Sequence, residues 1–156
     1  MSDQLLVDAQ LQRARGFLLD AKLTARTGGF VVTALLGASG SGKSTALRII
    51  AGLERPKTGI VRLGSEVWFD ARTWVPPQRR GIGYVSQDLA LFPPLGVESN
   101  ITFGLWDWSS RARRARTAEL LGALRLEGTL HARPSELSGG QRQRVALARA
   151  VARTPR

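Results

Sequence analysis

Apolar and polar residues alternate along the first part of the chain, in segments 5–11 and 16–23. A period of two is typical of a strand that buries one face, so both segments are predicted to be strands of an antiparallel sheet. Segments 59–63 and 66–69 predict two further, shorter strands. Together, the four segments predict a small antiparallel β subdomain.

A continuous apolar run lies between these two pairs of segments, at residues 30–36. It is partly β-branched and shows no polar alternation, which predicts a buried parallel strand. Residues 43–51 then show helical spacing, with Leu47 and Ile50 on the apolar side and Gly52 as the stop signal. A buried strand followed by a helix indicates an α/β core.

Helical spacing dominates the second half of the chain. Segment 82–85 predicts one more strand, and residues 97–133 are predicted to be helical with breaks at Gly104 and Gly122. The apolar positions of this region include Leu120, Leu121 and Leu124. A final Ala-rich segment places four apolar residues on one helical face: Val145, Ala148, Val151 and Ala152.

The link between the apolar run and its helix is a complete P-loop, Gly37-Ala38-Ser39-Gly40-Ser41-Gly42-Lys43-Ser44-Thr45. Its glycines let backbone N–H groups approach phosphate oxygens closely, and the helix N-terminus adds a favourable field for an anion. Lys43 is predicted to reach the β- and γ-phosphates, and Ser44 to ligate Mg²⁺. An ordinary glycine-rich turn is the alternative, and the flanking strand and helix argue against it. The predicted nucleotide-binding residues are Gly37, Ser39, Gly40, Gly42, Lys43, Ser44 and Thr45.

A second glycine-rich turn, Leu137-Ser138-Gly139-Gly140-Gln141, opens the Ala-rich helix. Ser138 stands where an N-cap belongs, and the two glycines leave the helix N-terminus sterically bare. A bare helix N-terminus can bind an anion. An ordinary capped helix is the simpler interpretation, and the P-loop upstream favours the anion site.

Three motifs now stand in order along the chain: Lys43 in the P-loop, Gln87 in Tyr84-Val85-Ser86-Gln87-Asp88, and the turn at 137–141. In this order they resemble the nucleotide-binding domain of ABC transporters. The resemblance implies ATP and Mg²⁺ as cofactors, with Gln87 ligating Mg²⁺ or orienting the attacking water. It also implies that Ser138, Gly139, Gly140 and Gln141 act in trans, on ATP held by a second nucleotide-binding subunit in a head-to-tail dimer.

Segment 87–101 resembles the corresponding loop of bacterial importer ATPases. Segments 67–70 and 76–84 are similar to the molybdate-importer branch, although sulfate, sugar and polyamine importers share much of the same run. The resemblance implies an ATP-binding subunit that couples ATP hydrolysis to uptake of a solute such as molybdate or another oxyanion. Such a subunit is peripheral to the cytoplasmic face of the inner membrane. It is held there by transmembrane subunits, which would face residues 94–103.

The resemblance also implies the fold class and the domain organisation. We expect an α/β fold, with a P-loop NTPase core built on a truncated parallel sheet, an antiparallel β subdomain and a helical insert. The family carries an acidic strand beyond the signature turn, and the chain stops at Arg156, so we expect an N-terminal fragment that hydrolyses little ATP by itself. A nucleotide-binding module without hydrolysis is therefore the first alternative. The expected parts are 1–30 with 58–75 (antiparallel β), 31–52 with 80–88 (P-loop core), 95–136 (helical subdomain) and 137–153 (signature turn and helix).

The formal net charge of +11 raises a second alternative, a soluble ABC ATPase that acts on nucleic acid. Most of the 23 basic residues are arginines, and they are dispersed except for a cluster at 111–116. Dispersed arginines do not form a nucleic-acid patch, and the cluster at 111–116 is interpreted as a solvated helix face. We therefore expect no nucleic-acid partner. The chain contains no cysteine, which excludes disulfides and thiolate metal sites. No run approaches the ~20 apolar residues of a membrane span, and residues 1–4 lack the basic flank and apolar core typical of a signal peptide.

Four single residues invite a functional interpretation. Trp106 and Trp108 could form a stacking platform, but partly buried core or interface positions are the expectation. In the resembled family an aromatic residue stacks on adenine, and Phe17 lies in the corresponding region; its spacing differs, so it is expected in the core. His131 does not match the family's γ-phosphate histidine and is expected on the surface.

Overall fold

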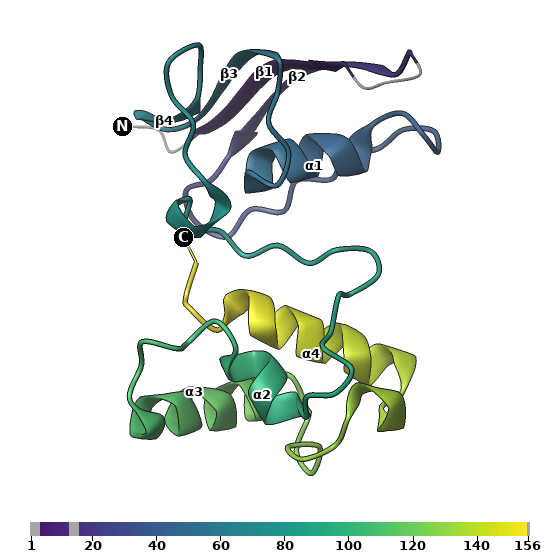
Figure 1. The fold of residues 1–156 in the computed structure, drawn as a ribbon, viewed down its shortest axis with the longest axis vertical. Helices are drawn as coiled ribbons and strands as arrows, with labels where there is room; N and C mark the ends of the chain where they lie inside the picture. The colour runs from purple at the N-terminus through teal and green to yellow at the C-terminus, as the bar shows by residue number, and fades with distance from the viewer. Residues whose placement is uncertain (1–3, 13–15, 156) are drawn as a thin grey trace. The chain divides into compact units, whose positions relative to one another are not determined.

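The computed structural model describes residues 4–12 and 16–155. The description leaves out residues 1–3, 13–15 and 156. Arg13, Arg15 and the terminal Arg156 are among them. The chain divides into two compact units, Met1–Gly81 and Ile82–Arg156 (Figure 1). The first unit contains β1 (Gln4–Gln12), β2 (Leu18–Arg26), α1 (Lys43–Ala51), β3 (Thr58–Leu63), β4 (Glu66–Phe69) and the short 3₁₀ helix η1 (Pro77–Arg79). The second contains α2 (Val97–Thr102), α3 (Ser110–Ala123), the 3₁₀ helix η2 (Pro134–Glu136) and α4 (Gly139–Val151).

The sheet of the first unit is antiparallel throughout, with the strand order β2-β1-β3-β4. Its alternation matches the sequence pattern, because Val7, Ala9 and Leu11 of β1 are buried while the residues between them are exposed. Val7 pairs with Leu23 of β2 on one side and with Val61 of β3 on the other. The four predicted strands are confirmed.

Helix α1 begins and ends where the sequence predicts. Gly42 precedes it and Gly52 follows it, both with a left-handed backbone, and the N–H of Gly52 donates to the carbonyl of Ile49 at 3.0 Å. The predicted apolar face is wrong in part, because Leu47 is 48% exposed whereas Ile49 is fully buried. The buried face instead contains Ala46 and Ile49. Each of them precedes by one residue a side chain of the predicted face, Leu47 or Ile50.

The apolar run at residues 30–36 is not a strand, and neither is segment 82–85. Phe30 is 98% exposed and Leu36 is 88% exposed, so the prediction of a buried parallel strand is wrong for this structure. The reason is that a parallel strand exists only through ladders to neighbouring strands. Within the residues described, strand pairing occurs among β1 to β4 and in one isolated bridge between Phe69 and Trp74, and none of it reaches this run.

A buried arginine joins α1 to the rest of the first unit. Arg80 is fully buried, and its guanidinium donates to the carbonyls of Ile49 (2.7 Å), Ile50 (2.8 Å) and Val75 (2.9 Å). It also lies over the rings of Trp68 and Trp74, 5.4 and 4.9 Å from their centroids. Burial lowers the pKa of Arg80 to about 10, so the guanidinium keeps its charge at neutral pH. The last turn of α1 is thereby tied to the segment that follows the sheet.

Replacing Arg80 should therefore destabilise the protein. In Arg80→Met, the apolar stem is kept but three carbonyls lose a charged donor, and we expect a loss of about 3 kcal/mol in the free energy of unfolding. Urea denaturation followed by tryptophan fluorescence measures the change. The exposed neighbour Arg79→Met is the matched control and should leave the midpoint unaltered. An Arg80→Met midpoint equal to that of the control would contradict the role of this contact.

The core of the second unit lies among its three α-helices. It includes Val97 and Ile101 of α2, Leu120 and Leu121 of α3, and Val145 and Ala148 of α4. The predicted apolar faces of α3 and α4 are thus confirmed. Helix α2 ends at Thr102, before the break predicted at Gly104. The second predicted break, Gly122, lies inside α3. Trp108 packs against this core, but Trp106 is 78% exposed and does not. His131 is exposed, as predicted. Across the part of the chain that the structure describes, no helix combines the length and apolarity needed to cross a membrane.

Candidate nucleotide-binding site

The P-loop of the first unit is a tight turn that only glycine can complete. Gly42 has φ of 93° and caps α1, with the N–H of Ala46 donating to its carbonyl at 2.8 Å. A Cβ on Gly42 would lie 2.6 Å from Cδ1 of Leu19 in β2, so any side chain here would strain the backbone and displace the Leu19 side chain. Gly40 is also left-handed, with φ of 79°. The loop therefore keeps its backbone bare, as a cradle for phosphate requires.

The ammonium group of Lys43 lies inside this loop. Its Nζ donates to the carbonyl of Ala38 at 2.6 Å and to that of Gly37 at 2.8 Å, with the hydroxyl of Ser41 at 3.4 Å. An anionic oxygen is a stronger acceptor for an ammonium group than a carbonyl, so a phosphate would compete well for these bonds. The ammonium group is thus held within the loop by two carbonyl oxygens and one hydroxyl.

The other predicted P-loop residues differ in their accessibility. Ser39, Gly40 and Ser44 are exposed, so their polar groups are open to a ligand and a cation. Thr45 is buried in the inward face of α1 and belongs to the packing of the helix. Ser44 therefore has the more accessible hydroxyl for Mg²⁺.

Beside the P-loop, the first unit contains a cavity of about 200 Å³. It is lined by residues of β2, the apolar run and the start of α1: Leu19, Asp20, Ala21, Lys22, Leu23, Leu35, Leu36, Ser41, Gly42, Lys43 and Ala46. Phe17 is half-buried, and its ring lies 3.5 Å from where a Cβ on Gly42 would stand. The aromatic ring expected in the core thus lies against the phosphate loop. The sequence signal for this was its position as the only aromatic residue before the apolar run.

The second glycine turn begins α4 in the second unit. The hydroxyl of Ser138 accepts from the N–H of Gln141 at 3.2 Å, and Oε1 of Gln141 accepts from the N–H of Ser138 at 2.8 Å. This reciprocal pair is a capping box, which satisfies two donors at the helix start. A Cβ on Gly139 would meet nothing within 4 Å, and the turn from Ser138 to Gly140 is exposed. The helix N-terminus is therefore open to an approaching anion.

Gln87 is exposed at the start of an irregular loop in the second unit. The N–H of Leu89 donates to the carbonyl of Ser86 at 3.0 Å, and Leu89 and Ala90 both have positive φ. The sequence did not signal that Arg149 of α4 holds this loop, with Nη1 donating to the carbonyl of Ala90 at 2.7 Å and Nη2 to that of Leu89 at 2.9 Å. Burial lowers the pKa of the Arg149 guanidinium.

The predicted site residues fall into two groups. The P-loop residues come together in the first unit, whereas Gln87 and the turn at Ser138–Gln141 belong to the second. Among the described residues, no three His, Cys, Asp or Glu side chains gather as a metal-binding cluster. Hydroxyl and amide oxygens, from Ser44 and Gln87, are ligand types that suit Mg²⁺.

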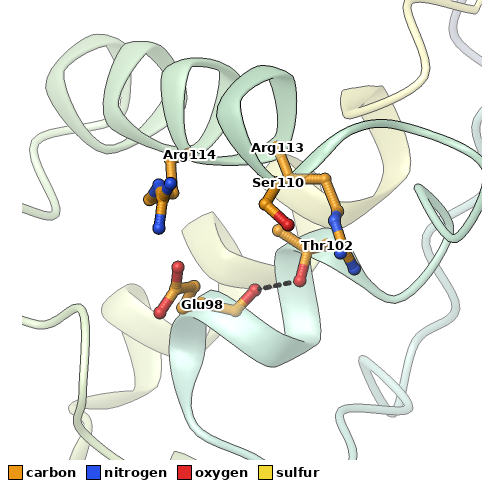
Figure 2. Close-up of a pocket in the computed structure, with 5 residues that line it drawn as sticks. All are labelled: Glu98, Thr102, Ser110, Arg113 and Arg114. Atoms are coloured by element: carbon orange, nitrogen blue, oxygen red, sulfur yellow. Dashed lines mark hydrogen bonds between the residues drawn. The ribbon is translucent and has the colours of Figure 1, made fainter.

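A further cavity of about 190 Å³ lies in the second unit, between α2 and the start of α3 (Figure 2). It is lined by Glu98 and Thr102 of α2 and by Ser110, Arg113 and Arg114 of α3. The Thr102 hydroxyl donates to the carbonyl of Glu98 at 2.9 Å, and the Glu98 carboxylate faces the cavity opposite Arg114. None of the predicted nucleotide-binding residues lines this cavity.

Comparisons with known proteins agree on one family. The family model described as "ABC transporter" matches residues 19–156. The chain is 48% identical over 141 residues to the molybdenum import ATP-binding protein ModC of Thiobacillus denitrificans, which covers 90% of the chain and 38% of that protein. It is 55% identical over 125 residues to the Fe(3+) ions import ATP-binding protein FbpC of Pseudomonas fluorescens, which covers 80% of the chain and 35% of that protein.

A solved structure gives the same result for the fold. The ATP-binding cassette MJ0796, in a dimeric post-hydrolysis state bound to ADP and Pi, matches with a TM-score of 0.81 and 33% identity. The match covers 97% of the chain and 70% of the cassette. By contrast, the chain spans only 35–38% of the length of the two curated relatives.

Proposed function

Because the chain belongs to the ABC transporter family of ATP-binding cassettes, we propose that it forms part of the ATP-binding subunit of an importer. This subunit couples ATP binding and hydrolysis to the uptake of a solute. The observation that carries the proposal is the P-loop with Lys43 held inside it, 2.6 and 2.8 Å from the oxygens that phosphate would replace. The names of the curated relatives, both import ATP-binding proteins, support the direction of transport.

The roles of the P-loop residues follow from the chemistry of phosphoryl transfer, which depends on charge neutralisation and positioning. The backbone N–H groups of Gly37, Ser39, Gly40 and Gly42 would bind the phosphates, and Lys43 would neutralise the β- and γ-phosphates. Ser44 and Gln87 would serve as protein ligands of Mg²⁺, which would supply further positive charge to the phosphates. Gln87 would also orient the attacking water, and Phe17 would lie against the adenine base.

The signature turn would act across a dimer of two nucleotide-binding subunits. Its open glycines and exposed N-cap suit an anion that arrives from outside the protomer, and the α4 dipole favours negative charge there. Ser138, Gly139, Gly140 and Gln141 would therefore contact the γ-phosphate of ATP held by the other subunit. The dimeric state of the related cassette supports a dimer, and its head-to-tail arrangement is part of the proposal.

Transmembrane subunits are the proposed partners, and the subunit would be peripheral to the cytoplasmic face of the inner membrane. The exposed aromatic Phe103, with the exposed Trp106 three residues beyond it, supports a protein contact in the region of residues 94–103. For the solute we propose molybdate, on the wider coverage of the molybdenum relative and on segments 67–70 and 76–84. Ferric iron is the second candidate, because the iron relative has the higher identity.

Solute uptake tests the proposed function directly. Cells that express the complete transporter encoded with this chain should accumulate radiolabelled molybdate, and the uptake should vanish in the Lys43→Ala variant, because transport needs bound ATP. Ferric iron and sulfate, offered separately and as competitors, serve as controls for the solute. If the cells take up ferric iron alone, the solute is ferric iron and the proposal of molybdate is wrong. Uptake of none of the three, or uptake unaffected by Lys43→Ala, would contradict the proposed function.

A further inference from the structure

The loop that follows Gln87 has an unusual backbone. Leu89 and Ala90 are consecutive non-glycine residues with φ of 62° and 43°, in the left-handed region that such residues seldom adopt. Two adjacent residues of this kind persist only where the surrounding structure holds them. The contacts that hold the loop should therefore matter for the direction in which Gln87 is presented.

Arg149 supplies these contacts from α4. Its guanidinium donates to both strained residues, at 2.7 Å to the carbonyl of Ala90 and 2.9 Å to that of Leu89. The same group lies over the ring of Phe92, 5.2 Å from its centroid. A planar fork that binds two successive carbonyls and stacks on a ring fixes orientation as well as distance, which a lysine could not do.

The far end of the loop is fixed from α2. The buried amide of Asn100 accepts from the N–H of Phe92 at 2.9 Å and donates to the carbonyl of Phe92 at 3.2 Å. The Phe92 ring packs on that of Phe103 with centroids 4.3 Å apart. Asn100 thus anchors the loop at Phe92, and Arg149 determines the path between Phe92 and Gln87.

We propose that Arg149 is a positioning residue, which aims the Gln87 side chain by holding the carbonyls of Leu89 and Ala90. The inference rests on the proposed function, in which Gln87 serves Mg²⁺ and water. Arg149 lies ten residues beyond Gly139 on the same helix, about 15 Å along its axis at 1.5 Å per residue. One rigid helix therefore carries the signature turn at its start and holds the glutamine loop of its own subunit near its end. A displacement of α4 by the partner's nucleotide would move Gln87 as well.

Arg153 provides a matched control on the same helix. It also makes two contacts with an irregular segment, donating to the carbonyl of Gly104 at 2.9 Å and to Oδ2 of Asp107 at 2.7 Å. It touches no residue of the 87–92 loop by these bonds. A loss of stability common to both arginine variants can therefore be separated from an effect on Gln87.

Hydrogen–deuterium exchange of the full-length subunit tests the holding contact without nucleotide. In Arg149→Met, amides 87–92 should exchange about tenfold faster, while Arg153→Met should change exchange only around residues 104–107. Unchanged exchange at 87–92 in Arg149→Met would overturn the inference. This measurement decides the point even if the subunit proves not to bind ATP, which would refute the proposed function instead.

Kinetics of the full-length subunit test the consequence for catalysis. We expect Arg149→Met to lower kcat by about 10- to 100-fold and to raise the Mg²⁺ concentration for half-maximal rate, as loss of an outer-sphere partner does. Affinity for ATP without Mg²⁺ should be unaltered, and Arg149→Lys, which keeps one donor, should recover part of the rate. Arg153→Met should keep the parental Mg²⁺ dependence. If Arg149→Met and Arg153→Met share the same kcat and Mg²⁺ dependence, Arg149 has a structural role alone and the inference is wrong.

Discussion

Lys43→Ala is expected to remove most ATP binding. In the structure its ammonium group is the cation held within the P-loop, 2.6–2.8 Å from two carbonyl oxygens that phosphate oxygens would replace. A hydrogen bond to a charged group contributes about 1.5–3 kcal/mol, and Lys43 would make such bonds to two phosphates. We expect a loss of about 3 kcal/mol or more, which is over ~100-fold in Kd. Isothermal titration calorimetry with Mg²⁺-ATP measures it.

Two further variants separate charge from folding in this experiment. Lys57→Ala removes an exposed lysine of the same unit and should leave the affinity unchanged. Lys43→Arg keeps the positive charge but brings a bulkier head, and it should recover only part of the binding. Equal affinity of Lys43→Ala and the parent would refute the assignment of the P-loop.

Ser138→Arg is expected to stop turnover by the full-length subunit while leaving ATP affinity of the monomer intact. The exposed turn at Ser138–Gly140 is where the partner's γ-phosphate would arrive, and an arginine side chain would occupy that space. Loss of a preorganised group that stabilises developing charge costs about 10²–10³ in kcat. Size-exclusion chromatography with ATP should show that dimerisation is lost. The rate of phosphate release should fall by about 10²–10³.

The Ser138 variant also loses a helix cap, so its control must lose one too. Ser109 caps α3 in the same way, its hydroxyl accepting from the N–H of Ala112 at 3.2 Å. Ser109→Ala should cost about 1 kcal/mol of stability without affecting turnover. Loss of ATP binding by monomeric Ser138→Arg would instead show that the turn acts on the nucleotide of its own subunit.

The parts of the fold that depend on local signals were predictable from the sequence. Period-two alternation identified β1 and β2, short apolar segments identified β3 and β4, and glycines at positions 42 and 52 marked both ends of α1. The fold class, an α/β P-loop NTPase of the ABC type, is confirmed by the match to a solved cassette. The order of the motifs identified the family, while the roles of individual site residues and the four-part domain division stay predictions.

The parts that depend on distant partners could not be predicted. The run at 30–36 has the composition of a buried strand, but a strand needs a ladder and no described strand pairs with it. Arg80 and Arg149 bind carbonyls that lie 30–31 and 59–60 residues away in sequence. Every residue carries a backbone carbonyl, so the sequence does not indicate which carbonyl a distant arginine will bind.

The exposed run at 30–36 also affects the tendency of the protein to aggregate in solution. It holds no proline and no charge and is rich in Val, Leu and Phe, which is the composition of segments that pair edge to edge between chains. The net charge of +11 keeps copies apart only over the range of the Debye length, about 8 Å at physiological ionic strength and roughly 30 Å at 0.01 M. Long-range repulsion therefore protects the apolar run in dilute buffer and weakens as salt is added. We therefore expect a purified sample to aggregate faster as the salt concentration is raised.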